Sequence, residues 1–258
     1  MFHSFDIFRP YPQLTAGYTD RDGGVSQGSY ASFNCHPDGG DDPRAVAANR
    51  TRLEQALGMR LITARQTHGT EILHVNRAFL EAFPSDRSRL QEGKDALITA
   101  EPGFIIGVHT ADCIPLLLYD RRQQVCAAIH AGWRGTVAGI TTKTLTELSH
   151  TYGSRPDDLL AAIGPGISQM HYEVGDEVYQ AFRDAAFPME QIAFRSQPFR
   201  KWHIDLKEAN RHLLTEYGLT ASQITDAGIC TLQDTNYFSA RRMGIRSGRI
   251  LTYIGICK

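Results

Sequence analysis

The chain has 258 residues, of which 42% are hydrophobic and 21% are charged, a balance typical of a globular protein with a sizeable core. Its formal net charge of −1 at pH 7 provides no general attraction to phosphate backbones or anionic lipid, so nucleic acid and membranes are poor candidate partners. No sequence feature indicates an obligate protein partner.

The first ten residues include Asp6 and Arg9 and contain no continuous apolar run. We therefore expect neither a secretory signal nor a membrane anchor, and we expect a cytoplasmic location. The five cysteines have no disulfide-framework spacing, which agrees with a reducing compartment and mostly buried thiols.

Apolar runs bounded by turn residues predict strands along most of the chain. We place these strands at Leu14–Tyr18, Leu61–Gln66, Glu71–Val75, Ala96–Thr99, Phe104–Val108, Ile114–Tyr119, Val125–Ile129, Leu159–Ile163, Ile224–Thr231 and Arg249–Ile256. The four residues from Thr67 to Thr70 form either a tight reversal or a strand-end loop, because Gly69 frees the backbone there. His68 would then lie at an exposed tip.

Helical periodicity and capping residues predict several helices between these strands. The helices are expected at Pro43–Leu57, from about Val137 to Tyr152, at Gly175–Phe187, and from Asp205 to about Gly218. The first has the clearest boundaries, because Asp42 can cap it, Pro43 suits its first turn and Gly58 follows it. Mixed α and β elements without a long linker or repeat favour a single α+β or α/β domain over residues 1–258.

The stretch from Gly107 to Gly135 contains the strongest candidate site. Cys113 precedes one predicted strand and His130 follows the next. Antiparallel pairing of these strands would bring the thiol and the imidazole to the same end of the sheet. With His68, they make a ligand set of the kind that holds zinc with a fourth position open. The spacing alone is not diagnostic, because no C-x-x-C or H-E-x-x-H pair is present.

Other interpretations of these residues stay open at this point. Cys113 could be a small buried hydrophobe, His130 could close a strand end, and His68 could be an ordinary loop residue. His109 shares a strand face with Cys113 and is expected to line the same pocket.

Several further residues are candidate contacts. The irregular segment from Ser26 to Gly40 presents Asn34 and His36, and segments of this kind are often functional. Asp112 and Arg65 lie beside proposed ligands and could orient water or substrate, although a salt link is an equal alternative. Further candidate groups for binding an anion are Arg134, Arg241 and Arg242. The structural alternative is a strand-to-helix turn for Arg134 and a solvated surface for the adjacent Arg241 and Arg242.

Six motifs occur in order along nearly the whole chain. They are T-D-R-D-G-G-V-S-Q-G-S-Y-A-S-F-N, R-Q-T-H-G, H-T-A-D-C-I-P-L-L-L, H-A-G-W-R-G, G-P-G-I and Y-F-S-A-R-R. Together they resemble the laccase-domain family, also called YfiH-like or purine nucleoside phosphorylase / polyphenol oxidase-like proteins. The chain departs from the family pattern at Cys35 and in the segment H-P-D-G-G-D-D around His36.

The resemblance implies a layered α/β/β/α fold with mixed sheets and zinc ligands at His68, Cys113 and His130. It also implies phosphorolysis of purine nucleosides, namely adenosine, inosine, guanosine and methylthioadenosine, together with adenosine deaminase activity. For deamination, zinc deaminases use a glutamate two residues after a ligand histidine. Gly132 occupies that position here, so Asp112 or Glu71 would have to act instead.

Three alternative functions remain open besides phosphorolysis and deamination. A copper-dependent polyphenol oxidase could use the same ligands, but multicopper oxidases typically need H-x-H pairs, and this chain has none. A Cys–His amide hydrolase acting on cell-wall precursors would use Cys113 as nucleophile and His130 as base. A binding module with structural zinc would require a fourth protein ligand.

Overall fold

The computed structural model describes residues 1–197 and 200–258. Its strands are β1 (Phe2–Ser4), β2 (Leu14–Thr19), β3 (Arg60–Ile62), β4 (Glu71–His74), β5 (Lys94–Thr99), β6 (Phe104–Thr110), β7 (Ile114–Asp120), β8 (Val125–Ala131), β9 (Leu159–Ile163), β10 (Glu173–Val174), β11 (Ala193–Arg195), β12 (Trp202–Ile204), β13 (Ile224–Asp226) and β14 (Ile250–Ile256). Its α-helices are α1 (Pro43–Leu57), α2 (Arg77–Glu81), α3 (Pro84–Leu90), α4 (Trp133–Val137), α5 (Ile140–Tyr152), α6 (Asp176–Asp184), α7 (Met189–Ile192), α8 (Leu206–Glu216) and α9 (Ala240–Met243).

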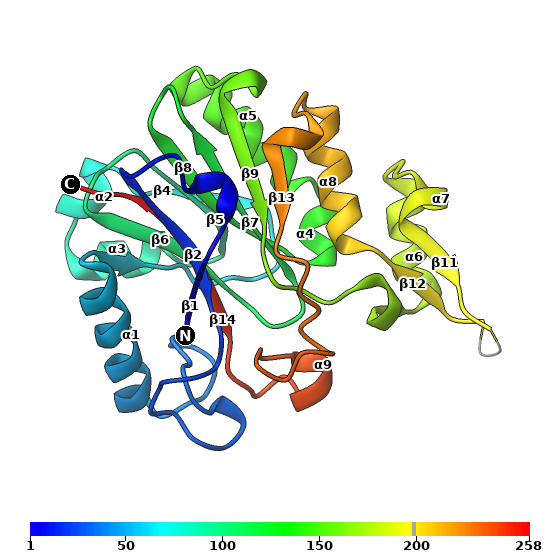
Figure 1. The fold of residues 1–258 in the computed structure, drawn as a ribbon, viewed down its shortest axis with the longest axis horizontal. Helices are drawn as coiled ribbons and strands as arrows, with labels where there is room; N and C mark the ends of the chain where they lie inside the picture. Colours follow the sequence, from blue (N-terminus) through cyan, green and yellow to red (C-terminus); the bar gives the residue numbers. More distant parts are fainter. Residues whose placement is uncertain (198–199) are drawn as a thin grey trace.

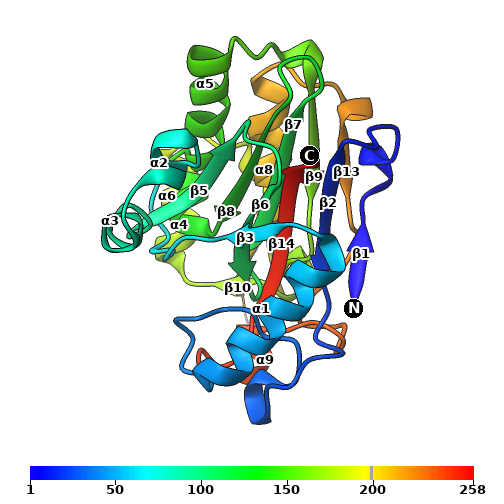
Figure 2. The same ribbon diagram turned by 90° about the vertical axis from the view of Figure 1, so that its left-hand side faces the viewer.

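Two mixed sheets form the centre of the molecule. One has the strand order β1-β2-β14-β6-β3, and Figure 2 shows β14 between β2 and β6. The other has the order β13-β9-β7-β8-β5-β4. Each sheet combines antiparallel pairs with parallel ones, such as β3 with β6 and β4 with β5. Apolar side chains from both sheets share one buried cluster, so the sheets pack face to face.

Helices cover the outer faces of both sheets (Figure 1). Leu53 of α1 packs on the outer face of the first sheet in one apolar cluster with Leu251 of β14. Leu145 of α5 and Leu214 of α8 pack on the outer face of the second sheet with Leu116 of β7. The layers are therefore α/β/β/α, as the family resemblance implied.

The local sequence accounts for the boundaries of α1, which runs from Pro43 to Leu57 as predicted. Asp42 accepts a hydrogen bond from the backbone N–H of Arg44, and Gly58 ends the helix with φ of 66°. The αL conformation at Gly58 suits glycine because a side chain would be strained there.

The antiparallel pairing of β7 with β8 positions the candidate site. Ile114 pairs with Ala131 and Pro115 with His130, so Cys113 lies beside the end of β8. On the other side of β8, Ala96 of β5 pairs with Ile129. The residue before Ala96, Asp95, consequently lies next to His130.

Some predicted elements differ from the observed ones. The strand predicted at Leu61–Gln66 ends at Ile62, and β3 and β4 belong to different sheets. The segment around His68 is therefore a loop between layers. The helix predicted from Val137 to Tyr152 is interrupted at Gly139, where φ is 82°. The strand predicted to reach Thr231 stops at Asp226.

A third, small sheet with the order β10-β12-β11 was not predicted from the sequence. It projects at one side of the molecule with α6 and α7 (Figure 1). Its strands have two or three residues each, too short for a periodic signal to stand out. Across the part of the chain that the structure describes, we find no helix with the length and apolarity needed to span a bilayer.

Candidate metal centre

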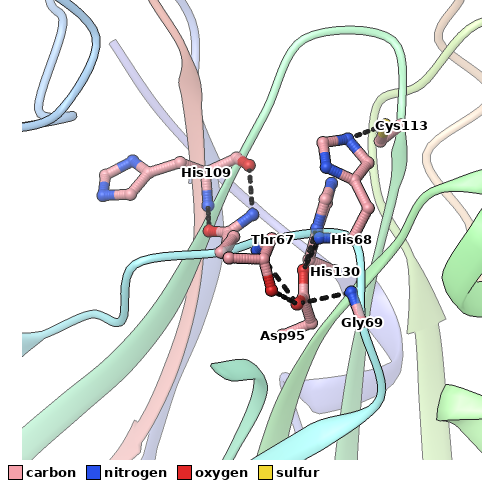
Figure 3. A network of polar contacts seen from close by, with 8 residues as sticks. Thr67, His68, Gly69, Asp95, His109, Cys113 and His130 are labelled. Atoms are coloured by element: carbon pink, nitrogen blue, oxygen red, sulfur yellow. Dashed lines mark hydrogen bonds and ion pairs between the residues drawn. The ribbon is translucent and has the colours of Figure 1, made fainter. Parts of the chain in front are cut away.

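His68, Cys113 and His130 converge from three separate segments (Figure 3). His68 lies on the loop between β3 and β4 with φ of 61°, and Cys113 lies between β6 and β7. His130 belongs to β8 and is 3% exposed. One potential ligand atom from each residue lies within 4.8 Å of the other two. The structure thus brings together the three residues proposed from the sequence.

The distance between two of these atoms is close to the spacing around a tetrahedral metal ion. Nε2 of His68 lies 3.8 Å from Sγ of Cys113. Zinc bonds of about 2.3 Å to sulfur and about 2.0 Å to nitrogen place tetrahedral ligand atoms roughly 3.5 Å apart. Small adjustments of the exposed His68 side chain would close the difference. Two imidazoles and a thiol can therefore hold a metal ion here.

Asp95 organises the site from behind, and sequence analysis missed it. Its carboxylate is fully buried and lies 2.8 Å from Nδ1 of His130. It also accepts hydrogen bonds from the backbone N–H groups of Thr67, His68 and Gly69 at 2.8–3.1 Å (Figure 3). One side chain thereby orients a ligand imidazole and holds the loop that carries the other.

These contacts keep the Asp95 carboxylate ionised. Burial alone would raise its pKa, but the hydrogen bond and the charge of His130, together with the backbone donors, lower the pKa of Asp95 to about 2. The sequence carried one signal of this role, namely an acidic residue in the otherwise apolar strand K-D-A-L-I-T.

The thiol and the imidazole of the site stabilise each other's charged forms. Burial opposes the charge on both groups, yet the positive charge of His130 and hydrogen bonds from His130 and His68 lower the pKa of Cys113. Reciprocally, the thiolate and Asp95 raise the pKa of His130. A lowered thiol pKa suits both metal ligation and nucleophilic attack.

Gly132 allows the ligands to approach the backbone. A Cβ atom at this position would lie 2.8 Å from Cδ2 of His68 and 3.1 Å from Sγ of Cys113. Any larger residue would push against both ligands. This explains why the position that carries glutamate in zinc deaminases has no side chain here.

The ligands open into a cavity of about 630 Å³, a volume suited to a small organic molecule. The lining consists of His36, Gln66, His68, His109, Thr110, Ala111, Asp112, Cys113, His130, Ile167, Tyr172, Ala240, Arg241, Ile245 and Arg249. Two guanidinium groups and several imidazoles thus face a space that also has apolar walls.

His109 lines this cavity, as predicted, but it lies outside the three-residue ligand group. Its ring stacks at a tilt against His36, with 4.8 Å between the ring centroids. The side chain of Gln66 holds the backbone of His109 through two hydrogen bonds of 2.7 and 2.8 Å. Burial lowers the pKa of both histidines, so both rings are neutral near pH 7.

The two adjacent arginines have different surroundings. Arg241 lines the cavity and its guanidinium donates to the carbonyl oxygen of Glu173. Arg242 instead donates to the carbonyl oxygens of Thr231 and Leu232 at 2.7 and 2.6 Å. Arg242 lies outside the cavity lining and its guanidinium fastens a loop. Its role in substrate binding stays a prediction.

Asp112 lies at the cavity with φ of 86°. Its two carboxylate oxygens accept hydrogen bonds of 2.7 Å, one from the Thr231 hydroxyl and one from the backbone N–H of Arg241. These contacts tie the C-terminal loop to the Cys113 segment. Asp112 is thus placed to hold Cys113, the next residue in the chain, in position.

Two further candidates lie away from the cavity lining. Arg65 is exposed and forms ion pairs with Asp38 and Glu92 at 3.0 and 2.7 Å. These ion pairs are the salt link given above as the equal alternative, and the catalytic role of Arg65 stays a prediction. Glu71, the alternative proton carrier, pairs with Lys94 at 3.5 Å and is likewise outside the lining residues.

Asn34 and Arg134 are also outside the cavity lining. Asn34 is fully buried and its side-chain oxygen accepts from the backbone N–H groups of His36 and Arg249 at 3.2 and 3.1 Å. It therefore positions two cavity residues, and its contact with substrate stays a prediction. Arg134 stacks over the ring of Trp133, with 4.3 Å from Cζ to the ring centroid.

The layered mixed sheets and the His–Cys–His group beside a polar cavity agree with a match to one protein family. Residues 15–257 match the family described as "Multi-copper polyphenol oxidoreductase laccase". The chain belongs to this laccase-domain family, as the motifs predicted.

Similar proteins cover almost the whole chain. A purine nucleoside phosphorylase of Bacteroides thetaiotaomicron is 43% identical over 98% of this chain and 96% of its own length. Adenosine deaminase RL5, from an unknown prokaryotic organism, is 39% identical over 88% of this chain and 87% of its own length. The crystal structure of YlmD from Geobacillus stearothermophilus superposes with a TM-score of 0.89 at 32% identity, covering 97% of this chain and 94% of that one.

Proposed function

We propose that this chain is a zinc-dependent purine nucleoside phosphorylase that also has adenosine deaminase activity. Adenosine, inosine, guanosine and methylthioadenosine are the proposed substrates, with phosphate as co-substrate. The observation that carries the proposal is the His68–Cys113–His130 group at the wall of a cavity that also presents Arg241 and Arg249. The relatives named purine nucleoside phosphorylase and adenosine deaminase support the same assignment.

The donor set supports zinc over copper as the metal. Two imidazoles and one thiolate are ordinary zinc ligands, and the open fourth position is typical of catalytic zinc sites. A multicopper oxidase needs several copper sites, whereas the residues described by the structure hold a single group of this kind. When bound, zinc would supply Lewis-acid chemistry at the cavity wall.

Phosphorolysis requires an anion to be held against a nucleoside, and the chain offers cationic groups for this. Arg241 and Arg249 bring positive charge to the cavity that contains the ligands and can attract phosphate electrostatically. Tyr172 and Ile167 contribute aromatic and apolar surface to the same cavity, which suits a purine base. The contact between Asp95 and Nδ1 of His130 fixes the orientation of the His130 ring.

A single assay tests this proposal. Purified protein is incubated with adenosine or inosine, with and without phosphate, while base release and bound metal are measured. We expect base release that depends on phosphate and is lost, together with bound metal, in Cys113→Ala and His68→Ala. His74→Ala and Cys257→Ala are matched controls, because these residues lie outside the cavity lining. Protein with its full metal content that releases no base from either nucleoside would contradict the proposal.

A Cys–His amide hydrolase is a second candidate, and one specific contact favours it. Asp95 binds Nδ1 of His130 at 2.8 Å, and His130 in turn lowers the pKa of Cys113. Acid, imidazole and thiol in this sequence are the parts of a nucleophilic triad. Thorough treatment with a chelator distinguishes the candidates. Hydrolysis of a cell-wall precursor amide that persists without metal would favour the hydrolase over the phosphorylase.

A further inference from the structure

A second cluster of nucleophilic and basic side chains lies outside the cavity lining. Cys230 Sγ is 3.6 Å from Nδ1 of His171, and the same nitrogen is 3.0 Å from Oγ of Ser168. The backbone N–H of Ser168 also donates to Cys230 Sγ at 3.4 Å. The three residues are partly buried, so the site is partly shielded from solvent but remains accessible.

Two loops build this cluster. Gly166 and Cys230 form an isolated parallel bridge, which brings the loop after β9 against the loop after β13. Ser168 and His171 follow on the first loop, in a short 3-10 turn over Gln169–His171. The cluster is therefore fixed by backbone pairing and is not an accidental approach of flexible side chains.

The surroundings of Cys230 favour a charged sulfur. Partial burial opposes the thiolate, but the hydroxyl and backbone N–H of Ser168 donate to it, as do the backbone N–H groups of Gln233 and Leu232, and the pKa of Cys230 is lowered. Two fully buried cysteines, Cys35 and Cys126, provide a contrast. Burial raises the pKa of Cys35 to about 12, and it raises the pKa of Cys126 further.

We propose that Cys230, His171 and Ser168 form a reactive-thiol site, separate from the metal centre, that is modified by peroxides and other small electrophiles. With hydrogen peroxide, the sulfur attacks one oxygen, an S–O bond forms and the O–O bond breaks. The leaving hydroxide takes a proton to become water. The sulfur is oxidised by two electrons to a sulfenic acid and the peroxide is reduced. The proposal does not depend on the function assigned to the cavity.

Competitive labelling tests the site in the intact protein. The protein is treated with iodoacetamide at pH 7, and alkylation of each cysteine is followed by peptide mass mapping. Cys257 is the internal reference, because it is also partly buried but contacts the hydroxyl of Thr15 at 3.3 Å. We expect Cys230 to react about tenfold faster than Cys257, because the hydrogen-bond donors around its sulfur favour the reactive thiolate. Hydrogen peroxide with dimedone should trap the sulfenic acid at Cys230.

Variants identify the groups that activate the sulfur. His171→Asn and Ser168→Ala should each slow labelling of Cys230 at least threefold and leave Cys257 unchanged, while His212→Asn, a histidine of α8 paired with Glu216, should change neither. Equal rates for Cys230 and Cys257 in the natural protein would overturn the proposal, even if a variant fails to fold. The proposal would also be overturned if both variants fold and their Cys230 is labelled at the natural rate.

Discussion

Replacement of Asp95 by asparagine isolates the contribution of the buried carboxylate to the metal centre. Asparagine has nearly the same size, but it lacks the charge that His130 and three backbone N–H groups share. Carboxylates that orient ligand histidines typically contribute 10- to 100-fold to metal affinity. We therefore expect Asp95→Asn to weaken zinc binding by about 10- to 100-fold, which equals roughly 1.4–2.7 kcal/mol.

The assay is competition for zinc against a chromophoric chelator at constant pH. Asp120→Asn is the matched control, because Asp120 is also fully buried, accepts two backbone N–H bonds of 2.8 Å, and lies at the opposite end of β7 from Cys113. The control should keep natural zinc affinity. A folded Asp95→Asn protein that binds zinc as tightly as the natural chain would refute the reasoning, as would an equal loss in Asp120→Asn.

Three further predictions concern the surroundings of the site. Gly132→Ala should weaken zinc binding in the same competition assay, because the added Cβ would press on His68 and Cys113. The control, Gly69→Ala, should bind zinc normally, because a Cβ there would make only contacts of 3.5 Å. Burial and a neighbouring guanidinium lower the pKa of His36 from 6.5 to about 4. The contribution of neutral His36 to stability is therefore complete above pH 6.5 and is lost progressively as the pH falls from 6.5 through 4. The free energy of unfolding should consequently drop by about 2 kcal/mol more between pH 7 and pH 5 in the natural chain than in His36→Gln, measured by urea titration. Arg242→Ala should lower the melting temperature because loop carbonyls lose their donor, whereas Arg241→Ala should mainly raise the KM for phosphate; the reverse pattern would contradict their placement.

The sequence by itself determined the elements whose causes are local. Capping by Asp42 and the αL residue Gly58 set the ends of α1, and two apolar runs with a polar turn set the β7–β8 pair. That pair alone placed Cys113 and His130 at one end of the sheet. His68 joined them through its motif and the family resemblance, because nothing in its spacing requires the approach.

The tertiary structure decided what depends on contacts between distant segments. Asp95 meets His130 across 35 positions, and Asp112 meets the backbone of Arg241 across 129. No periodicity or turn rule encodes such distances, because they arise from how sheets and loops stack. For the same reason adjacent Arg241 and Arg242 look equivalent in sequence, yet one borders the cavity and the other is bound by loop carbonyls. Local chemistry therefore placed Cys113 and His130 together, and packing specified which neighbours support them.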